Sequence, residues 1–169
     1  MSGEQTNPSV GAPQLLALTT LLDALDWYER NLCSAVLHDR RGFRVRFQPE
    51  TFVHLIQLRN KYGQEPRNRR LALQEIRRGQ IRFAAGRFSP QRTQELAWAE
   101  EIVRSHDRIC RNWQPLGSGA EAYLKDFGGE GVHKYRVMIC KVRGTIREVV
   151  TIFPRESIGA NELAAQIWP

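Results

Sequence analysis

The spacing of apolar residues changes along the chain from a helical period to a strand period. Near the start, Leu18, Leu22, Leu25 and Leu32 recur at helical spacing, which predicts an amphipathic helix over residues 13–33. Near the end, apolar and polar residues alternate, which predicts three strands over 122–127, 134–142 and 145–153. Helices followed by an antiparallel meander predict an α+β fold, with N-terminal helices packed on a C-terminal antiparallel sheet.

A short hairpin is expected directly after the first helix. The runs 34–38 and 43–47 flank a turn that ends at Gly42, a pattern typical of a β-hairpin. The second run alternates strictly, so its apolar and arginine side chains should lie on opposite faces. The apolar face would carry Phe43, Val45 and Phe47, and the polar face Arg44 and Arg46.

The remaining segments have helix start and stop signals. One helix is expected over 51–62, ended by Gly63, and another over 70–78. Ser89-Pro90 should begin a long helix, because a capping hydroxyl followed by proline suits a helix N-terminus. Its apolar stripe would run through His106, Cys110 and Trp113, with Pro115 closing it. Pro154 is expected to end the last strand, and a short helix is expected over 161–168.

Length and composition predict one domain over residues 13–169, preceded by a disordered leader over 1–12. The longest apolar runs are too short to cross a bilayer, and residues 1–10 lack the features of a secretion signal. We therefore expect a cytoplasmic protein without a membrane partner. The three cysteines, Cys33, Cys110 and Cys140, are far apart, which argues against both a disulfide framework and a thiolate metal site.

The positive charge is concentrated in one quarter of the chain. The net charge is +7, and residues 40–82 hold twelve Lys or Arg against three Glu. A solvated basic surface is one interpretation. The clustering favours the other, a face that binds a polyanion, and arginine is well suited to bidentate phosphate contacts. RNA is the partner we expect, with DNA as the alternative.

No motif indicates a cofactor or a metal ion. The chain has no P-loop, no dinucleotide-binding glycine pattern and no nucleophile elbow, and its four histidines are scattered. His54 lies within the helix expected over 51–62 and admits two interpretations. It is either a satisfied core or boundary histidine, or a general base or acid at a phosphodiester, since imidazole titrates near neutral pH.

Three residues on the expected strands are further candidates. Lys125 should share a face with Tyr123, and Arg136 should share one with Met138. Thr151 should lie on the same apolar face as Val149 and Phe153. It could form a cross-strand pair there, or orient a phosphate oxygen beside a cation.

Taken together, these segments resemble a phage-associated branch of the barnase–EndoU–colicin–RelE nuclease superfamily. The resemblance covers about residues 15–156. Its sharpest part is the spacing of Phe47, Phe52, His54, Leu55 and Leu58. Two features depart from the family pattern. Gln57 stands where a glycine is frequent, and the second histidine of related branches is absent from the helix.

The resemblance implies helices packed on a four-stranded antiparallel sheet and cleavage of RNA without a metal, by attack of the 2′-hydroxyl on phosphorus. It implies that His54 is the base or acid, that Lys125 and Arg136 hold the phosphate, and that Thr151 orients it. The residues expected to contact nucleic acid are Arg44, Arg46, Arg59, Lys61, Arg70, Arg77 and Arg78.

Three functional hypotheses follow. The first is a metal-independent endoribonuclease of toxin or phage-effector type. The second is a catalytically inactive nucleic-acid-binding or phage accessory protein with the same fold. The third is a protein-interaction module whose basic face meets an acidic partner such as an inhibitor or antitoxin. Only the first predicts RNA cleavage, and the second predicts salt-sensitive binding without cleavage.

Overall fold

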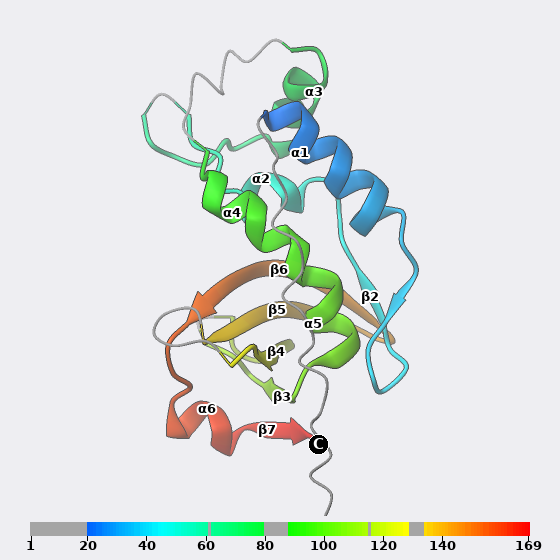
Figure 1. The fold of residues 1–169 in the computed structure, drawn as a ribbon, viewed down its shortest axis with the longest axis vertical. Helices are drawn as coiled ribbons and strands as arrows, with labels where there is room; N and C mark the ends of the chain where they lie inside the picture. Colours follow the sequence, from blue (N-terminus) through cyan, green and yellow to red (C-terminus); the bar gives the residue numbers. More distant parts are fainter. Residues whose placement is uncertain (1–19, 61, 80–87, 115, 129–133) are drawn as a thin grey trace, which may run out of the picture.

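The computed structural model describes residues 20–60, 62–79, 88–114, 116–128 and 134–169. The leader expected over 1–12 lies outside these residues. The fold is α+β, as expected, and consists of a curled seven-stranded sheet with most of its helices packed on one face (Figure 1). The sheet has three more strands than the four that the resemblance implies, with the order β1-β2-β6-β5-β4-β3-β7.

Neighbouring strands are antiparallel except for β2 and β6, which are parallel. The strands are β1 (Leu37–His38), β2 (Arg44–Arg46), β3 (Arg108–Arg111), β4 (Ala120–Asp126), β5 (Tyr135–Arg143), β6 (Ile146–Arg155) and β7 (Gln166–Trp168). The α-helices are α1 (Leu21–Tyr28), α2 (Thr51–Leu55), α3 (Arg69–Arg77), α4 (Pro90–Glu95), α5 (Ala99–Ser105) and α6 (Ala160–Ala164). A π-helical turn, Glu29–Cys33, extends α1, and a 3₁₀ turn, Leu96–Trp98, joins α4 to α5.

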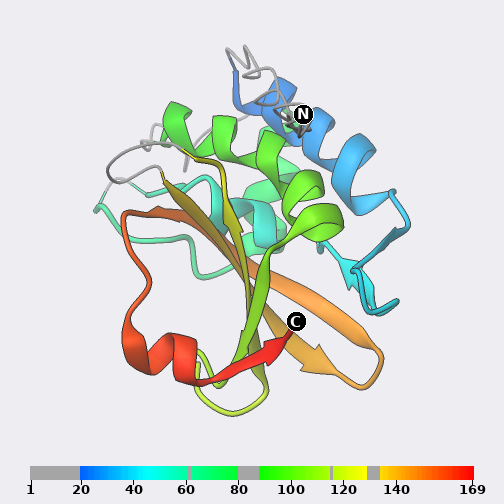
Figure 2. The same ribbon diagram turned by 60° about the horizontal axis from the view of Figure 1, so that its bottom comes forward.

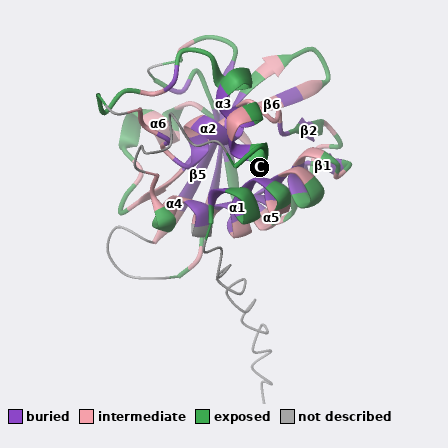
Figure 3. Cartoon of the chain, turned by 90° about the horizontal axis from the view of Figure 1, so that it is seen from above, coloured by how far each residue is buried: buried purple, intermediate pink, exposed green. Residues whose placement is uncertain are grey.

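The main core lies between the helices and one face of the sheet, and buried residues dominate this interior (Figure 3). Tyr28 of α1, Ile102 of α5 and Tyr123 of β4 are fully buried there. A second apolar cluster covers the middle of the opposite face, where Trp113 packs with Ala122 and Val137. We call these two sides the helix-covered face and the opposite face.

Several expected elements are confirmed. The hairpin forms with Leu37 opposite Val45, although its strands are short. The helix expected over 70–78 is α3, and Asn68 caps it by accepting a hydrogen bond from the Leu71 amide at 2.9 Å. The three C-terminal strands correspond to β4, β5 and β6. Within the described residues, the first helix continues to Cys33.

The helix expected over 51–62 is wrong in length, because α2 ends at Leu55. Gln57 adopts a left-handed conformation with φ 55°. The Leu58 amide then bonds to the Val53 carbonyl at 3.0 Å, and the Gln57 amide bonds to the His54 carbonyl at 3.1 Å. This pair of bonds is a Schellman motif, which usually has glycine at its left-handed position. Because glutamine occupies the position where glycine usually marks a helix end, the sequence pattern did not indicate that α2 ends there.

The long helix expected to reach Pro115 is also wrong, because α5 ends at Ser105. The imidazole Nδ1 of buried His106 lies 3.2 Å and 3.1 Å from the carbonyl oxygens of Ile102 and Val103, which it caps. The chain then becomes extended and forms β3, so Cys110 lies on a strand and not on a helix. All three cysteines are free thiols.

Two expectations about the C-terminal region are corrected. Pro154 does not end β6, which continues to Arg155. β2 pairs with β6 only as far as Glu148, so Pro154 lies on a part of β6 that has an open edge among the described residues. Proline is tolerated there because no neighbouring strand at that described edge needs a hydrogen bond from its backbone nitrogen. The helix expected over 161–168 is replaced by the shorter α6 and by β7, which pairs with β3.

A β-bulge corrects the expected orientation of Thr151. The register between β5 and β6 shifts between Ile139 and Cys140, so Val150 is an extra residue. As a result, Val149 is buried in the main core on the helix-covered face, whereas Thr151 shares the opposite face with Ile139. The two residues were expected on one face because alternation assumes a regular strand.

A largely buried ionic network ties the hairpin turn to the sheet. Arg41 lies between Asp39 and Glu121, at 2.8 Å and 2.6 Å, and Arg147 contacts Glu121 at 2.9 Å. The Tyr123 hydroxyl donates to Asp39 at 2.8 Å. These groups come from the turn after β1 and from β4 and β6, so the network joins segments that are distant in the sequence.

This network predicts a loss of stability in acid. Burial alone would raise the pKa of Asp39 and of Glu121, but hydrogen bonds from Tyr123, Arg41 and Arg147 lower both pKa values below 3.8 and 4.5. The stability that these carboxylates provide is therefore present above pH 4.5 and is lost as the pH falls through the lowered pKa values. Urea unfolding at pH 7, 4.5 and 3 should show this decline. A Glu121→Gln variant should show a smaller decline. If the free energy of unfolding falls equally with pH in the two proteins, Glu121 is not the source of the acid sensitivity.

Candidate functional site

His54 lies on a helix beside β6, near the point where β2 stops pairing with β6. Its helix, α2, packs beside β6, and the Thr51 hydroxyl donates to the Val149 carbonyl at 3.5 Å. The last residue of β2, Arg46, pairs with Glu148 of β6. Beyond Glu148 the edge of β6 has no neighbouring strand among the described residues, and α2 packs there. The buried neighbours of His54, Phe52 and Val53, hold the helix in the core, while His54 itself is 37% exposed.

A carboxylate orients the His54 ring. Nδ1 of His54 lies 2.8 Å from Oε2 of Glu65, a residue of the segment between α2 and α3. Partial burial alone would raise the pKa of Glu65, but the hydrogen bond with His54 and the charge of Arg69 outweigh it and lower that pKa. Glu65 is therefore an anion at neutral pH and favours a proton on Nδ1, which leaves the Nε2 lone pair as the basic one. Nε2 has no hydrogen-bond partner within the described part of the chain.

Two arginines complete the surroundings of Glu65. Arg69 donates to Oε1 at 2.6 Å from Nε, and Arg59 lies 3.6 Å from Oε2. Both arginines belong to the basic quarter of the sequence. With Glu65 and His54 they form a cluster that is net positive when His54 is neutral.

The His54 side chain opens onto a small hollow of about 170 Å³, the His54 hollow. It is lined by Gln48, Thr51, His54, Arg69, Lys141, Glu148, Val149 and Val150. Lys141 comes from β5 and is exposed, with no carboxylate in salt-bridge range among the described residues. The hollow thus combines a basic imidazole nitrogen with the positive charges of Arg69 and Lys141 and one carboxylate, that of Glu148.

Two other expected catalytic residues, Lys125 and Arg136, do not line the His54 hollow. Lys125 and Arg136 face each other across β4 and β5, on the helix-covered face. Lys125 lies 3.4 Å from Asp107. Arg136 is 7% exposed, and its Nε donates to Glu95 at 2.7 Å. Arg136 and Lys141 are five residues apart on β5, a separation of about 16 Å along a strand.

Thr151 is likewise separate from the phosphate-holding pair that was expected. It lies on the opposite face of the sheet, whereas Arg136 lies on the helix-covered face. The structure therefore does not assemble His54, Lys125, Arg136 and Thr151 into one site.

The expected nucleic-acid-binding residues fall into two groups. Arg44 and Arg46 are exposed on β2, with no carboxylate in salt-bridge range among the described residues. On the helical side, Arg59 pairs with Glu65, Arg70 with Glu50 and Arg77 with Glu29, and Arg78 is exposed. Lys61 lies outside the described residues. The described cations of the basic quarter therefore lie on separate elements, and those on the helical side are mostly paired with carboxylates.

Glu65, Arg69 and Lys141 were not predicted as partners of His54. Glu65 is eleven residues from His54, and no helical or strand spacing relates the two. Arg69 was counted within the basic quarter without a specific role. Lys141 comes from a strand that is distant in the sequence. Only the pairing of β5 with β6 brings it to the His54 hollow.

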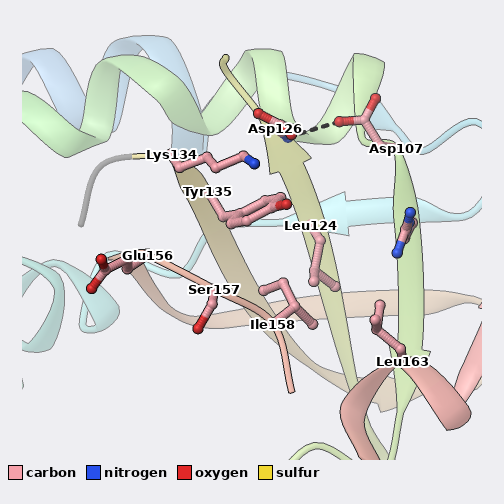
Figure 4. Close-up of a pocket in the computed structure, with 10 residues that line it drawn as sticks. Asp107, Leu124, Asp126, Lys134, Tyr135, Glu156, Ser157, Ile158 and Leu163 are labelled. Atoms are coloured by element: carbon pink, nitrogen blue, oxygen red, sulfur yellow. Dashed lines mark hydrogen bonds between the residues drawn. The ribbon is translucent and has the colours of Figure 1, made fainter. Parts of the chain in front are cut away.

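A larger hollow of about 400 Å³ lies near the other end of the sheet (Figure 4). Its rim carries the carboxylates of Asp107, Asp126 and Glu156, and Figure 4 shows Asp107 accepting a hydrogen bond from the Asp126 amide, at 2.7 Å. Tyr135 forms one wall. The lining holds three carboxylates against two cations, Arg108 and Lys134, so this hollow is a weaker candidate for polyanion binding than the His54 hollow.

Neither a metal site nor a membrane span is found in the described part of the chain. No group of three or more His, Cys, Asp or Glu side chains is arranged to hold a metal ion there. Among the described helices, none has the length and apolar character needed to traverse a bilayer.

Comparison with known proteins gives no match: no protein-family model, curated protein or solved structure is significantly similar to this chain. The fold and the site define an α+β protein with a histidine–glutamate pair beside exposed cations.

Proposed function

We propose that this protein is a metal-independent endoribonuclease whose reaction takes place in the His54 hollow. The observation that supports this proposal is the oriented imidazole. Nδ1 of His54 is held by Glu65 at 2.8 Å, and Nε2 is without a partner among the described residues, in a hollow that also contains Arg69 and Lys141. A histidine–carboxylate pair of this kind provides a general base at neutral pH.

The reaction follows from these groups. Nε2 of His54 takes the proton from a ribose 2′-hydroxyl, and the resulting oxygen attacks the adjacent phosphorus. The bond from phosphorus to the 5′-oxygen breaks, and that oxygen takes a proton from solvent. The products are a 2′,3′-cyclic phosphate and a 5′-hydroxyl end.

Charge stabilisation falls to Arg69 and Lys141. The phosphoryl oxygens gain negative charge during attack, and nearby cations stabilise that charge. Arg69 uses Nε and Nη2 to hold Glu65, which leaves Nη1 for a ligand. Lys141 is free of a carboxylate partner among the described residues and reaches the hollow from the sheet.

A second candidate function is nucleic-acid binding without cleavage. The placement of Lys125 and Arg136 outside the His54 hollow, and on the other face of the sheet from Thr151, favours it, because the catalytic set that the resemblance implies is not assembled. On the sequence resemblance alone we also propose a barnase-like or RelE-like ancestry, a cytoplasmic phage or toxin role, and an acidic inhibitor as protein partner.

The direct test incubates the purified protein with mixed-sequence RNA, with and without EDTA. We expect cleavage in both conditions, with cyclic phosphate and 5′-hydroxyl ends, because the proposed reaction uses no metal ion. A 2′-O-methyl RNA of the same sequence is the matched control and should remain intact, since it lacks the attacking hydroxyl. RNA that stays uncut in every condition would exclude the enzyme and leave the binding function.

A further inference from the structure

We propose that four cations on the opposite face of the sheet form the path along which single-stranded RNA reaches the His54 hollow. This inference rests on the proposed function and adds the surface that binds the substrate. We call Arg44, Arg46, Lys141 and Arg143 the sheet cation cluster. Two of them belong to β2 and two to β5, with β6 between them.

The strand register places the four side chains on one face. Arg46 is opposite Glu148 of β6, and Glu148 is opposite Lys141 of β5. Ile146, two residues from Glu148 on β6, is the partner of both Arg44 and Arg143. Directly paired residues share a face, and so do residues two apart on a strand. The four Cα atoms therefore mark a rectangle of roughly 7 by 10 Å, from the residue rise and the strand spacing.

The charges of this cluster are largely available. Arg44, Arg46 and Lys141 are exposed and have no salt-bridge partner among the described residues. Arg143 is 64% exposed and lies 3.5 Å from Glu148, whose other oxygen is 3.4 Å from the Gln48 amide. Glu148 is the acidic residue within the rectangle, so four positive charges surround one negative charge.

The cluster is continuous with the His54 hollow. Lys141 and Glu148 belong to both, so a chain that lies across β2, β6 and β5 passes the hollow at its edge. Figure 2 shows the turn between β5 and β6 projecting beside the β1–β2 hairpin, which leaves this end of the sheet outside the helical layer. A polyanion held by the sheet cations would therefore have a linkage next to the imidazole.

The helical arginines are less suited to this role. Arg70 and Arg77 are held by Glu50 and Glu29, and these carboxylates offset their charge. Contact with phosphate there would have to displace an existing ion pair. The sheet cations therefore provide more uncompensated charge than the arginines of α3.

A single strand fits this surface better than a duplex. The His54 hollow of about 170 Å³ has room for little more than one sugar–phosphate linkage. The proposed reaction also needs a 2′-hydroxyl that can turn in line with its phosphorus. Proteins that recognise specific RNA sequences mostly bind flexible single-stranded segments. We therefore assign the path to single-stranded RNA.

The test measures binding apart from cleavage. A fluorescent 2′-O-methyl oligonucleotide of mixed sequence reports affinity by anisotropy, because it cannot be cut. The variant Arg44→Gln/Arg46→Gln should bind about tenfold more weakly than the wild type, and its salt slope should fall by about 1.4, since each lost phosphate contact removes about 0.7. The matched control, Arg77→Gln/Arg78→Gln on α3, should bind within about twofold of the wild type.

Each outcome decides the inference. Weak binding by the β2 variant alone supports the path, whether or not natural RNA is cleaved in the separate assay, so failure of the nuclease proposal can be recognised independently. Equal weakening in both variants would show that RNA is not confined to the sheet and would overturn the path. Unchanged binding in the β2 variant, or no binding by the wild type, would overturn it as well. Unchanged circular dichroism of both variants confirms that they are folded.

Discussion

Replacing Glu121 by alanine is expected to lower the free energy of unfolding by about 3–5 kcal/mol, because the change breaks a buried ion pair and leaves its partner charges uncompensated. Glu121 is the carboxylate that contacts both Arg41 and Arg147, at 2.6 Å and 2.9 Å. The side chain of Arg147 is only 6% exposed. Without Glu121, solvent cannot easily stabilise this guanidinium, so the loss exceeds that of a surface pair.

Urea unfolding at pH 7 measures this effect, and Glu100→Ala is the matched control. Glu100 also pairs with an arginine, Arg104, at 2.8 Å, but both side chains are more than half exposed. Its removal should lower the free energy of unfolding by about 0.5 kcal/mol or less, as for other exposed helical pairs. Similar losses in the two variants would show that the network around Glu121 contributes no more than a surface contact.

The variant His54→Ala is expected to cleave RNA at least about 100-fold more slowly than the wild type, which is the loss typical of removing a general base. The ring is 37% exposed and lies at the end of a helix held by Phe52 and Val53, so its removal should leave the fold intact. Cleavage rates under single-turnover conditions, with thermal unfolding as the check on folding, give the measurement.

Two further variants separate catalysis from structure. Glu65→Gln keeps the shape of the partner side chain but removes its charge, so it should slow cleavage less than His54→Ala does. His38→Ala removes an exposed histidine of β1 and should cleave at the wild-type rate. If His54→Ala is as active as His38→Ala, the imidazole is a structural partner of Glu65 and the proposed reaction is wrong.

The sequence predicted the fold class and most elements because their signals are local. Alternation identified β4, β5 and β6, helical spacing identified α1, and local helix signals identified α3. The errors arose where a side chain replaced the usual signal. Gln57 takes the left-handed position that glycine usually takes, and His106 caps the last carbonyls of α5. In both places the contacts of the folded chain decided the helix end.

The candidate site was only partly predictable for a different reason. His54 was identified, but its partners come from a connecting segment and from a strand almost ninety residues away. Spacing also cannot reveal that Arg136 is held by Glu95, or that a bulge turns Thr151 to the other side. These facts depend on pairing between distant segments, which local patterns do not encode.

The parallel pairing of β2 with β6 makes assembly of the candidate site depend on residues that lie far apart in the sequence. Residues 44–46 meet residues 146–148, so a loop of about a hundred residues must close before the sheet is complete. During synthesis, α2 and α3 leave the ribosome long before Lys141 and Glu148 do. A nascent chain that has not yet extended past residue 148 therefore carries the imidazole but neither the lysine nor the finished cation surface, and the candidate site is assembled only after β5 and β6 are added.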